Sequence, residues 1–378
     1  MVARPKGVYP VPNEQPWANR VLNPLDCSHQ WFGIEAEMKF GVFDHMDNSG
    51  VSLGQQIEER LRLIEAYDRG GFYAYHLAEH HGTPLGLAPS PNVFLAAVAQ
   101  RTKRLRFGPL VYMLPLYHPL RLIEEICMLD QMSSGRFELG IGTGVSPVEV
   151  GFYGVDVGQR RRRYIETLDV IRLGLTGDVL THHGEFFTFD HVPIVLRPVQ
   201  RPHPPLWYGL RDPDSTVWPA ANDVNVVANG PAVMVRKVTD RYRAEWAALG
   251  KSGTQLPLLG MNRMMVIADS RADAQQSAAS AYPSWRANME LLWKAHSVPF
   301  PLQLPMQFAT LQQHGGAFAG TASDARDYIA AQIETAGINY FVCDIAFGTM
   351  TFEEVMRTTT LLVREVLPAF SVCEPAAP

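Results

Sequence analysis

The 378-residue sequence lacks the features that mark several classes of protein. It has four cysteines and no CxxC pair, which argues against a disulfide framework and a structural zinc site and fits a reducing cytosol. Its formal net charge of −5 gives nucleic-acid binding no electrostatic support. There is no run of ~18 uncharged apolar residues and no apolar core of a secretory signal near the start. We therefore expect a cytoplasmic protein with no membrane or nucleic-acid partner.

The composition is that of an ordinary globular protein, with 47% hydrophobic and 19% charged residues. Residues 1–36 are rich in Pro and Asn and show no period, so we expect an arm there, one domain over 37–370 and a tail over 371–378. Strands are expected over 39–46, 73–81, 105–115, 136–144, 204–210, 223–230, 259–268 and 338–348, with a short additional strand in an excursion over 182–189. Because amphipathic helices separate the eight main strands, the sequence predicts a (βα)8 TIM barrel, with an open doubly wound sheet as the alternative. Residues 270–316 look irregular and partly helical and are the expected insertion.

Short signals mark the ends of several expected helices. Gly70 and Gly71 end the helix that follows the first strand. Pro119 suits the first position of a later helix, because its missing N–H would be unpaired there anyway. Thr351 and Glu354 form the pattern of a capping box at the start of the last helix.

The stretch LAEHH closes the second expected strand with a carboxylate and two imidazoles. In a (βα)8 barrel the active site lies at this end of the strands. Because successive strand residues point to opposite sides, His80 and His81 cannot both enter the barrel, and Glu79 shares a side with His81. Residue type alone leaves hydrogen-bonded capping of the strand and catalysis about equally open. Other polar residues at expected strand ends are Asp44, His45, Thr143, Arg211 and Asn229.

Three other chemistries find little support. Ligands for a metal on a strand are usually spaced i, i+2, whereas these histidines are adjacent, so no metal site is expected. There is no GxSxG elbow of a serine hydrolase. GIGTG over 140–144 lacks the third glycine of a dinucleotide fingerprint. We interpret it as a strand end where the backbone approaches a flat ligand, with a plain tight turn as the alternative.

Two helix starts could face an anion. The run over 160–163 is four arginines long, and although such a run is usually a solvated face, one of them could turn inward to an anion. The segment over 214–216 offers hydroxyls and free N–H groups that suit a phosphate. Simple capping by Ser215 or Thr216 is the alternative there.

These stretches share an order and a spacing with one family. LAEHH, GPLVYMLPLYHP, MLDQMSSGRFELGIGTG and GFYGVD before the arginine run resemble the bacterial luciferase-like, flavin-dependent monooxygenases, among them the alkanal monooxygenase alpha chains. The resemblance is closest over 39–163 and resumes more weakly over 214–218 and 320–368. It implies a (βα)8 barrel with an insertion, usually in a dimer.

The resemblance also implies a reaction. Reduced FMN from a separate flavin reductase would react with O2 to give a flavin C4a-peroxide, which oxygenates a small apolar substrate such as an aldehyde, a ketone or a terpenoid-like compound. Two alternatives stay open: hydride transfer with the deazaflavin F420 on the same fold, and a flavin-binding protein without turnover.

Several site residues follow from the resemblance. His80 matches the catalytic histidine and His81 its neighbour at the flavin, and an imidazole can take and return a proton near neutral pH. Leu110 and Val111 match a non-proline cis peptide beneath the flavin. The residues expected to line the substrate pocket are Phe43, Tyr112 and Tyr117.

The flavin phosphate has its own expected partners. Arg161 matches a phosphate-binding arginine, and Ser215 matches a phosphate-binding hydroxyl. The sequence departs from the luciferase alpha chain at two positions near the flavin: Gly142 stands where that chain has a reactive cysteine, and Thr143 stands where it has a second phosphate arginine. Arg211 could substitute for that arginine.

Overall fold

Parallel strands form a closed ring in the computed structural model, which describes residues 38–370; the expected arm and tail lie outside these residues. In chain order the ring consists of β1 (Lys39–Asp44), β2 (Ala74–Leu77), β3 (Arg106–Pro109), β4 (Tyr112–Met113), β5 (Leu139–Gly142), β8 (Leu206–Leu210), β9 (Asn225–Ala228), β10 (Leu259–Ile267) and β12 (Tyr340–Asp344). The pairing order is β3-β2-β1-β12-β10-β9-β8-β5-β4. Phe107 of β3 bridges Phe137 just before β5, which closes the ring.

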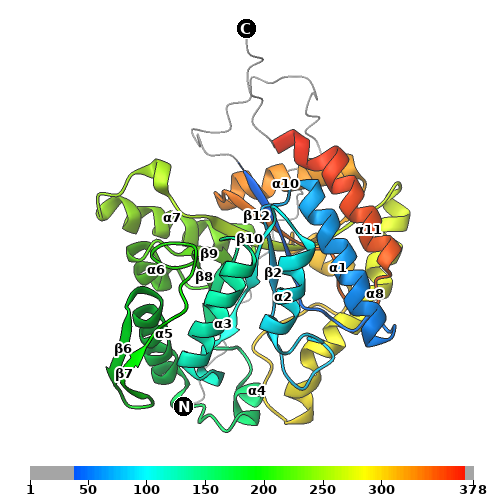
Figure 1. The fold of residues 1–378 in the computed structure, drawn as a ribbon. Coiled ribbons are helices and arrows are strands. Elements are labelled where there is room, and N and C mark those ends of the chain that lie inside the picture. Colours follow the sequence, from blue (N-terminus) through cyan, green and yellow to red (C-terminus); the bar gives the residue numbers. More distant parts are fainter. Residues whose placement is uncertain (1–37, 371–378) are drawn as a thin grey trace, which may run out of the picture.

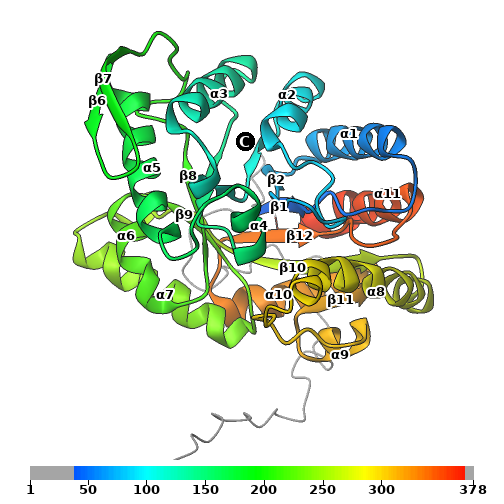
Figure 2. The same ribbon diagram turned by 90° about the horizontal axis from the view of Figure 1, so that it is seen from below.

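The expected (βα)8 barrel is therefore confirmed. β3 and β4 are separated only by Leu110 and Val111, so the nine strands fill eight positions, in chain order around the ring. An open doubly wound sheet is excluded. Helices surround the ring (Figure 2), and they are α1 (Leu53–Gly70), α2 (Pro91–Arg101), α3 (Pro119–Met132), α5 (Arg160–Thr176), α6 (Val217–Ala221), α7 (Ala232–Ala248), α10 (Ala322–Ala336) and α11 (Phe352–Leu361).

The helix ends follow the local signals in the sequence. Gly71 caps α1 in the left-handed conformation, with φ of 81°. Pro119 is the first residue of α3. The capping box of α11 is present, since the Thr351 side chain accepts from the backbone N–H of Glu354 and the Glu354 carboxylate accepts from that of Thr351. These short-range predictions are confirmed.

The expected insertion is more helical than the sequence indicated. Residues 271–295 form one long helix, α8 (Arg271–Ala295) (Figure 1), followed after an irregular stretch by the short α9 (Phe308–Gln313) and by β11 (Ala317–Gly320), which pairs with the end of β10 (Figure 2). Pro283 lies inside α8. Because proline usually ends a helix, the sequence did not predict one continuous helix here. β11 is only four residues long and has no flanking signal of its own.

The expected strand over 182–189 is also corrected. These residues include the turn of an antiparallel hairpin outside the barrel, formed by β6 (Val179–His183) and β7 (Thr188–Pro193). One further helix, α4 (Pro147–Phe152), lies beyond the end of β5 and was not expected. Among residues 38–370, no helix has both the length and the apolar character needed to cross a membrane.

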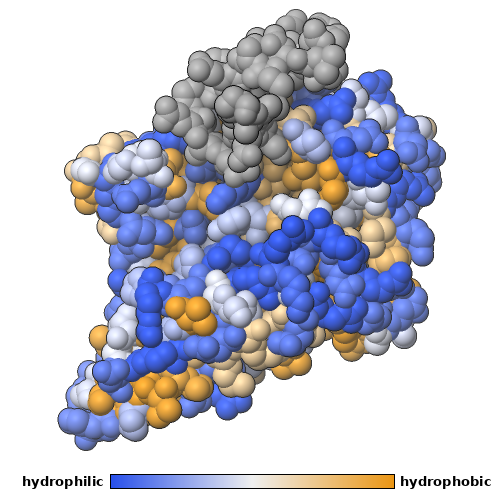
Figure 3. Space-filling model, turned by 45° about the horizontal axis from the view of Figure 1, so that its top comes forward, coloured by the Kyte–Doolittle hydropathy of each residue, from blue (hydrophilic) through white to orange (hydrophobic). Residues whose placement is uncertain are grey.

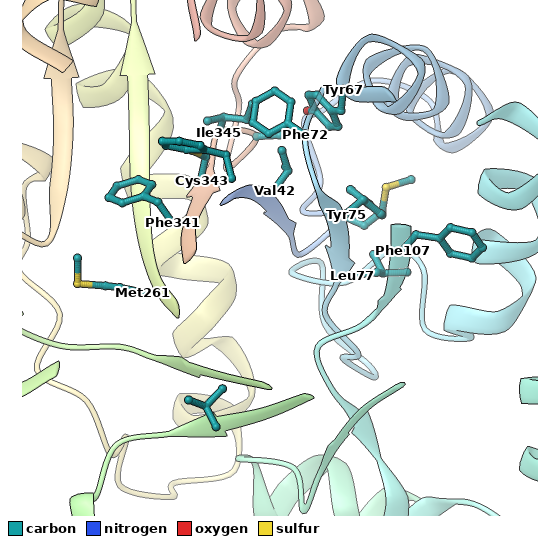
Figure 4. Close-up of a cluster of buried hydrophobic side chains, with 14 of the residues drawn as sticks. Val42, Tyr67, Phe72, Tyr75, Leu77, Phe107, Met261, Phe341, Cys343 and Ile345 are labelled. Atoms are coloured by element: carbon teal, nitrogen blue, oxygen red, sulfur yellow. The ribbon is translucent and has the colours of Figure 1, made fainter. Parts of the chain in front are cut away.

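Two sets of buried side chains hold the barrel in shape. Strand residues that point outward pack against the helices; Figure 4 shows Val42, Tyr75 and Cys343 of the strands close to Tyr67 of α1. Inside the barrel, Trp207 and Tyr340 fill the axis together with smaller apolar residues. The helices turn polar residues outward, so hydrophilic residues cover much of the surface with apolar ones between them (Figure 3). This packing fixes the strand ends, where the candidate site lies.

The seam between β5 and the β3–β4 segment depends on two glycines. A Cβ on Gly140 would meet the backbone carbonyl oxygen of Pro109, and a Cβ on Gly142 would meet the side chain of Val111. The glycines of GIGTG therefore serve close contact with the neighbouring strand. Close approach of this strand end to a flat ligand stays a prediction. Gly144, with φ of 76°, supplies the turn that follows.

Replacing Gly140 by alanine should lower the free energy of unfolding by at least about 2 kcal/mol, because a backbone carbonyl cannot turn aside for the new Cβ. Gly209 of β8 is the matched control, since a Cβ there has no neighbouring atom within 4 Å. Gly209→Ala should change the stability by less than ~0.5 kcal/mol. Urea unfolding of both variants measures the difference, and equal stabilities would contradict the packing argument.

Candidate active site

The alternation predicted for LAEHH continues beyond the last residue of β2. The His80 ring stacks on that of His45, which follows β1, with centroids 5.7 Å apart and planes at 25°. On the other side, His81 Nε2 lies 2.8 Å from Glu79 Oε1. The two histidines thus have different surroundings, as expected, and Glu79 and His81 do share a side.

A second carboxylate joins the two histidines from above the strand ends. Glu149 of α4 places Oε1 3.3 Å from His80 Nδ1, and its Oε2 accepts the backbone N–H of His81 at 2.9 Å. Tyr153 places its hydroxyl 2.8 Å from His81 Nδ1. The sequence around Glu149 signals only the start of a helix, at which the Ser146 side chain accepts from the backbone N–H of Glu149. No local pattern in the sequence indicates that the Glu149 carboxylate contacts His80.

Glu79 connects this pair to the next strand. Its Oε2 accepts the backbone N–H of Met113 at 2.8 Å, and the hydroxyl of Tyr117 donates to the same carboxylate. Burial, and then the charge of Glu79, raises the pKa of Tyr117 well above its usual value. The structure therefore places Glu79 as a buried positioning residue between β2 and β4.

Of the three residues expected in the substrate pocket, Tyr112 and Tyr117 lie together, with ring centroids 5.3 Å apart, whereas Phe43 contacts a different residue. Phe43 packs edge-on against His45 inside the barrel mouth, with ring centroids 4.8 Å apart. Tyr117 is engaged with Glu79. Tyr112 is completely buried and bonds through its hydroxyl to Asn92 of α2, so it faces the surrounding helices.

His45 and Asp344 are buried together at the ends of β1 and β12. Their nearest atoms, His45 Nδ1 and Asp344 Oδ2, are 3.9 Å apart. Burial, and then the neighbouring His80, holds the pKa of His45 well below its usual value. Burial, and then the carboxylates of Asp44 and Asp47, raises the pKa of Asp344 well above its usual value. Burial thus disfavours the charged form of both groups.

The residues expected at the flavin phosphate lie around the end of β8. Arg211 follows the last residue of β8, and Ser215 lies four residues further on, in the short turn of helix over 213–216. Tyr208 of β8 contacts Tyr164, one turn after Arg161 on α5, with ring centroids 6.5 Å apart. Arg161, Arg211 and Ser215 are exposed.

These three residues have side chains available for a ligand. Within residues 38–370, the side chains of Arg161, Arg211 and Ser215 form no hydrogen bond or ion pair with another protein group. The next arginine in the run differs, because Arg162 is ion-paired with Glu185. The Asp212 side chain caps the turn of helix, and Thr216 occupies the N-cap position of α6 without a side-chain capping bond, so the alternative of capping by the Ser215 or Thr216 hydroxyl is not seen.

The positions expected at the flavin before β4 and at the end of β5 lie side by side. The peptide bond between Leu110 and Val111 is cis, as the resemblance implies, and both residues are half-buried. Gly142 faces Val111 across the seam, and Thr143 follows it with its hydroxyl 3.4 Å from the carbonyl oxygen of Gly144. No group of three or more His, Cys, Asp or Glu side chains in the described part of the chain is arranged to hold a metal ion.

The same architecture occurs in known proteins. Residues 38–339 match the luciferase-like monooxygenase family. The chain belongs to this family. Protein y4wF from Sinorhizobium fredii is 42% identical, over 88% of this chain and 98% of that protein. The oxygenase component of flavin-dependent trigonelline monooxygenase from Acinetobacter baylyi is 27% identical, over 88% of this chain and 96% of that protein. Alkanal monooxygenase alpha chains are also among the relatives, which confirms the resemblance.

Solved structures of this luciferase-like monooxygenase fold agree. Monooxygenase RslO1 from Streptomyces bottropensis is similar with a TM-score of 0.80 at 27% identity, over 88% of this chain and 100% of that one. Two structures at 18% identity show the fold alone. One is the oxygenating constituent of 3,6-diketocamphane monooxygenase from Pseudomonas putida with FMN (TM-score 0.73, 88% and 98% covered). The other is a coenzyme F420-dependent reductase from Methanopyrus kandleri (TM-score 0.65, 89% and 100% covered).

Replacing His45 by phenylalanine should reduce the loss of stability in acid. The folded-state pKa of His45 is lowered, so below pH ~6.5 the unfolded chain takes up a proton that the folded protein refuses. Relative to the variant, the wild type should lose about 1 kcal/mol of unfolding free energy between roughly pH 7 and pH 5.5. Urea unfolding at the two pH values measures this. If the difference in unfolding free energy between wild type and variant is the same at both pH values, the buried imidazole of His45 accepts the proton in the folded protein.

Proposed function

We propose that this luciferase-like monooxygenase is the oxygenase component of a two-component system. It would take reduced FMN from a separate reductase and use O2 to oxygenate a small, mainly apolar organic compound, working as a homodimer. The trigonelline enzyme, named as an oxygenase component, supports the two-component reading.

The observation that carries this proposal is the set of unpaired groups around the end of β8. Two guanidinium groups and a hydroxyl, from Arg161, Arg211 and Ser215, stand on one rim of the barrel. Such donors suit a phosphate dianion. From there the half-buried Leu110 and Val111 and the side chain-free Gly142 lie toward the mouth, where a flat ring could rest. The residues present therefore fit FMN.

The chemistry divides between the cofactor and the chain. Reduced flavin, when bound, supplies the electrons that activate O2. The chain contributes His80, whose Nδ1 is engaged by Glu149 and whose Nε2 is left to take a proton from the reacting groups and return it. Glu79 and Tyr153 engage both ring nitrogens of His81, so His81 positions the strand end and we assign it no proton transfer.

Arg161→Ala should weaken FMN binding about tenfold or more, because a charged hydrogen bond to phosphate is lost. Riboflavin, which lacks the phosphate, should bind the variant and the wild type equally. Flavin fluorescence titration measures both. Arg162→Ala is the matched control from the same run of arginines. Because Arg162 is ion-paired with Glu185, this variant should leave FMN binding unchanged.

Equal losses for FMN and riboflavin would contradict the phosphate assignment. An anaerobic titration with F420 and with reduced FMN decides the cofactor. Tight binding of F420 and none of reduced FMN would replace the monooxygenase by a hydride-transfer enzyme of the same fold.

His80→Ala should retain FMN binding within about twofold and lose roughly 100-fold or more of the oxygenation rate, as expected for removal of a general acid or base. The assay supplies reduced FMN and O2 with a panel of carbonyl, aromatic and terpenoid compounds, and mass spectrometry detects the added oxygen atom. An unchanged rate would show that His80 is structural. If the wild type binds FMN but oxygenates no compound, a flavin-binding protein without turnover is the better description.

A further inference from the structure

Four rings, among them that of His80, meet on the opposite side of the barrel from the expected phosphate rim. His45 stacks on His80, Phe43 packs edge-on against His45, and Trp285 of α8 approaches His45 at 6.0 Å and 64°. β1, which carries Phe43 and is followed by His45, and β8, which precedes Arg211, occupy opposite positions in the ring of eight. This cluster is therefore separate from the expected phosphate site.

Three buried polar atoms in the cluster have no hydrogen-bond partner among residues 38–370. They are His45 Nδ1, Asp344 Oδ1 and Trp285 Nε1, and each residue is more than nine-tenths buried. Buried polar groups are normally paired, so three unpaired ones in a single place indicate where a ligand completes the bonding. His80, whose side chain is one-fifth exposed, connects the cluster to the barrel mouth.

The charge of the cluster limits the ligand. Burial disfavours the charged form of both His45 and Asp344. The nearby guanidinium group of Arg60 lies 3.0 Å from Asp44, which neutralises it. The burial that disfavours charge on these side chains also disfavours it on a ligand, which would lose its hydration here. An uncharged hydroxyl, by contrast, can accept from Trp285 and donate to His45 or Asp344, and a carbonyl oxygen can accept from Trp285.

We propose that the substrate of this site is an uncharged aromatic compound whose ring packs among Phe43, His45 and Trp285, and whose hydroxyl or carbonyl oxygen bonds to Trp285, Asp344 and His45. The proposal deepens the proposed function, since it names the substrate class of the same monooxygenase site. Ring-on-ring contacts favour a planar aromatic molecule over an aliphatic one of equal size.

The test compares four small probes by isothermal titration calorimetry on the full chain, with FMN present and absent. 4-Methylphenol has the ring and the oxygen, toluene lacks the oxygen, 4-methylcyclohexanol lacks the planar ring, and 4-methylbenzoate carries a charge. 4-Methylphenol should bind roughly 5- to 30-fold more tightly than each of the other three. Equal affinities, or tightest binding of the carboxylate or the alicyclic alcohol, would overturn the proposal.

Two ring-preserving variants locate the site. His45→Phe removes the ring nitrogens of His45 and Trp285→Phe removes Nε1 of Trp285, so each variant should bind 4-methylphenol about fivefold or more less tightly and bind toluene like the wild type. Trp293→Phe, on the same helix but packed against Phe300, is the matched control and should bind 4-methylphenol like the wild type. Loss of binding in the control alone, or no loss in the two variants, would overturn the assignment.

Flavin titration separates this inference from the proposed function. FMN affinity should be unchanged in Trp285→Phe, because the phosphate rim lies across the barrel. If FMN binds and the probes are not distinguished, the substrate proposal fails alone. If 4-methylphenol binds more tightly than the other probes but no flavin binds, the proposed monooxygenase function is wrong, whereas the proposed binding site for an aromatic compound is supported. A parallel fall in FMN affinity in both variants would show that the cluster holds the flavin ring, which overturns the substrate assignment.

Discussion

The close contact between β5 and the β3–β4 segment is the constraint on which the barrel mouth depends. Two strands approach this closely only because Gly140 and Gly142 present no Cβ to Pro109 and Val111. The contact closes the ring and brings the cis peptide of Leu110 beside the end of β5. A barrel opened at this seam would separate the surfaces on which a flat cofactor could rest.

Two buried carboxylates then give the adjacent histidines different tasks. Glu79 comes from the strand itself and engages His81, whereas Glu149 comes from α4 and reaches His80 as well as the backbone of His81. Because a strand alternates its side chains, one imidazole turns to the interior and the other to the surrounding elements. Adjacent histidines thus differ in their bonding: His80 is engaged by Glu149 through Nδ1, whereas both ring nitrogens of His81 have partners.

The mouth also separates charged from uncharged polar groups. Exposed guanidinium groups stand on the rim near β8, where water can hydrate them. Polar groups on the opposite side, near β1 and β12, are buried, and burial disfavours the charged forms of His45 and Asp344. The two edges of the barrel mouth therefore differ in how readily they accommodate charge.

Local sequence patterns determined the eight strand positions, the caps of α1 and α11 and the alternation of Glu79, His80 and His81, because each depends on neighbours only a few residues away. They underestimated the length of α8, which continues through a proline, and they did not indicate that the glycines of GIGTG pack against a strand that is distant in sequence. Only the tertiary structure brought Glu149 to His80, turned Tyr112 toward α2 and buried His45, Asp344 and Trp285 in one cluster. These contacts join residues tens to hundreds of positions apart, and ring closure decides them, because it sets which strand ends face one another.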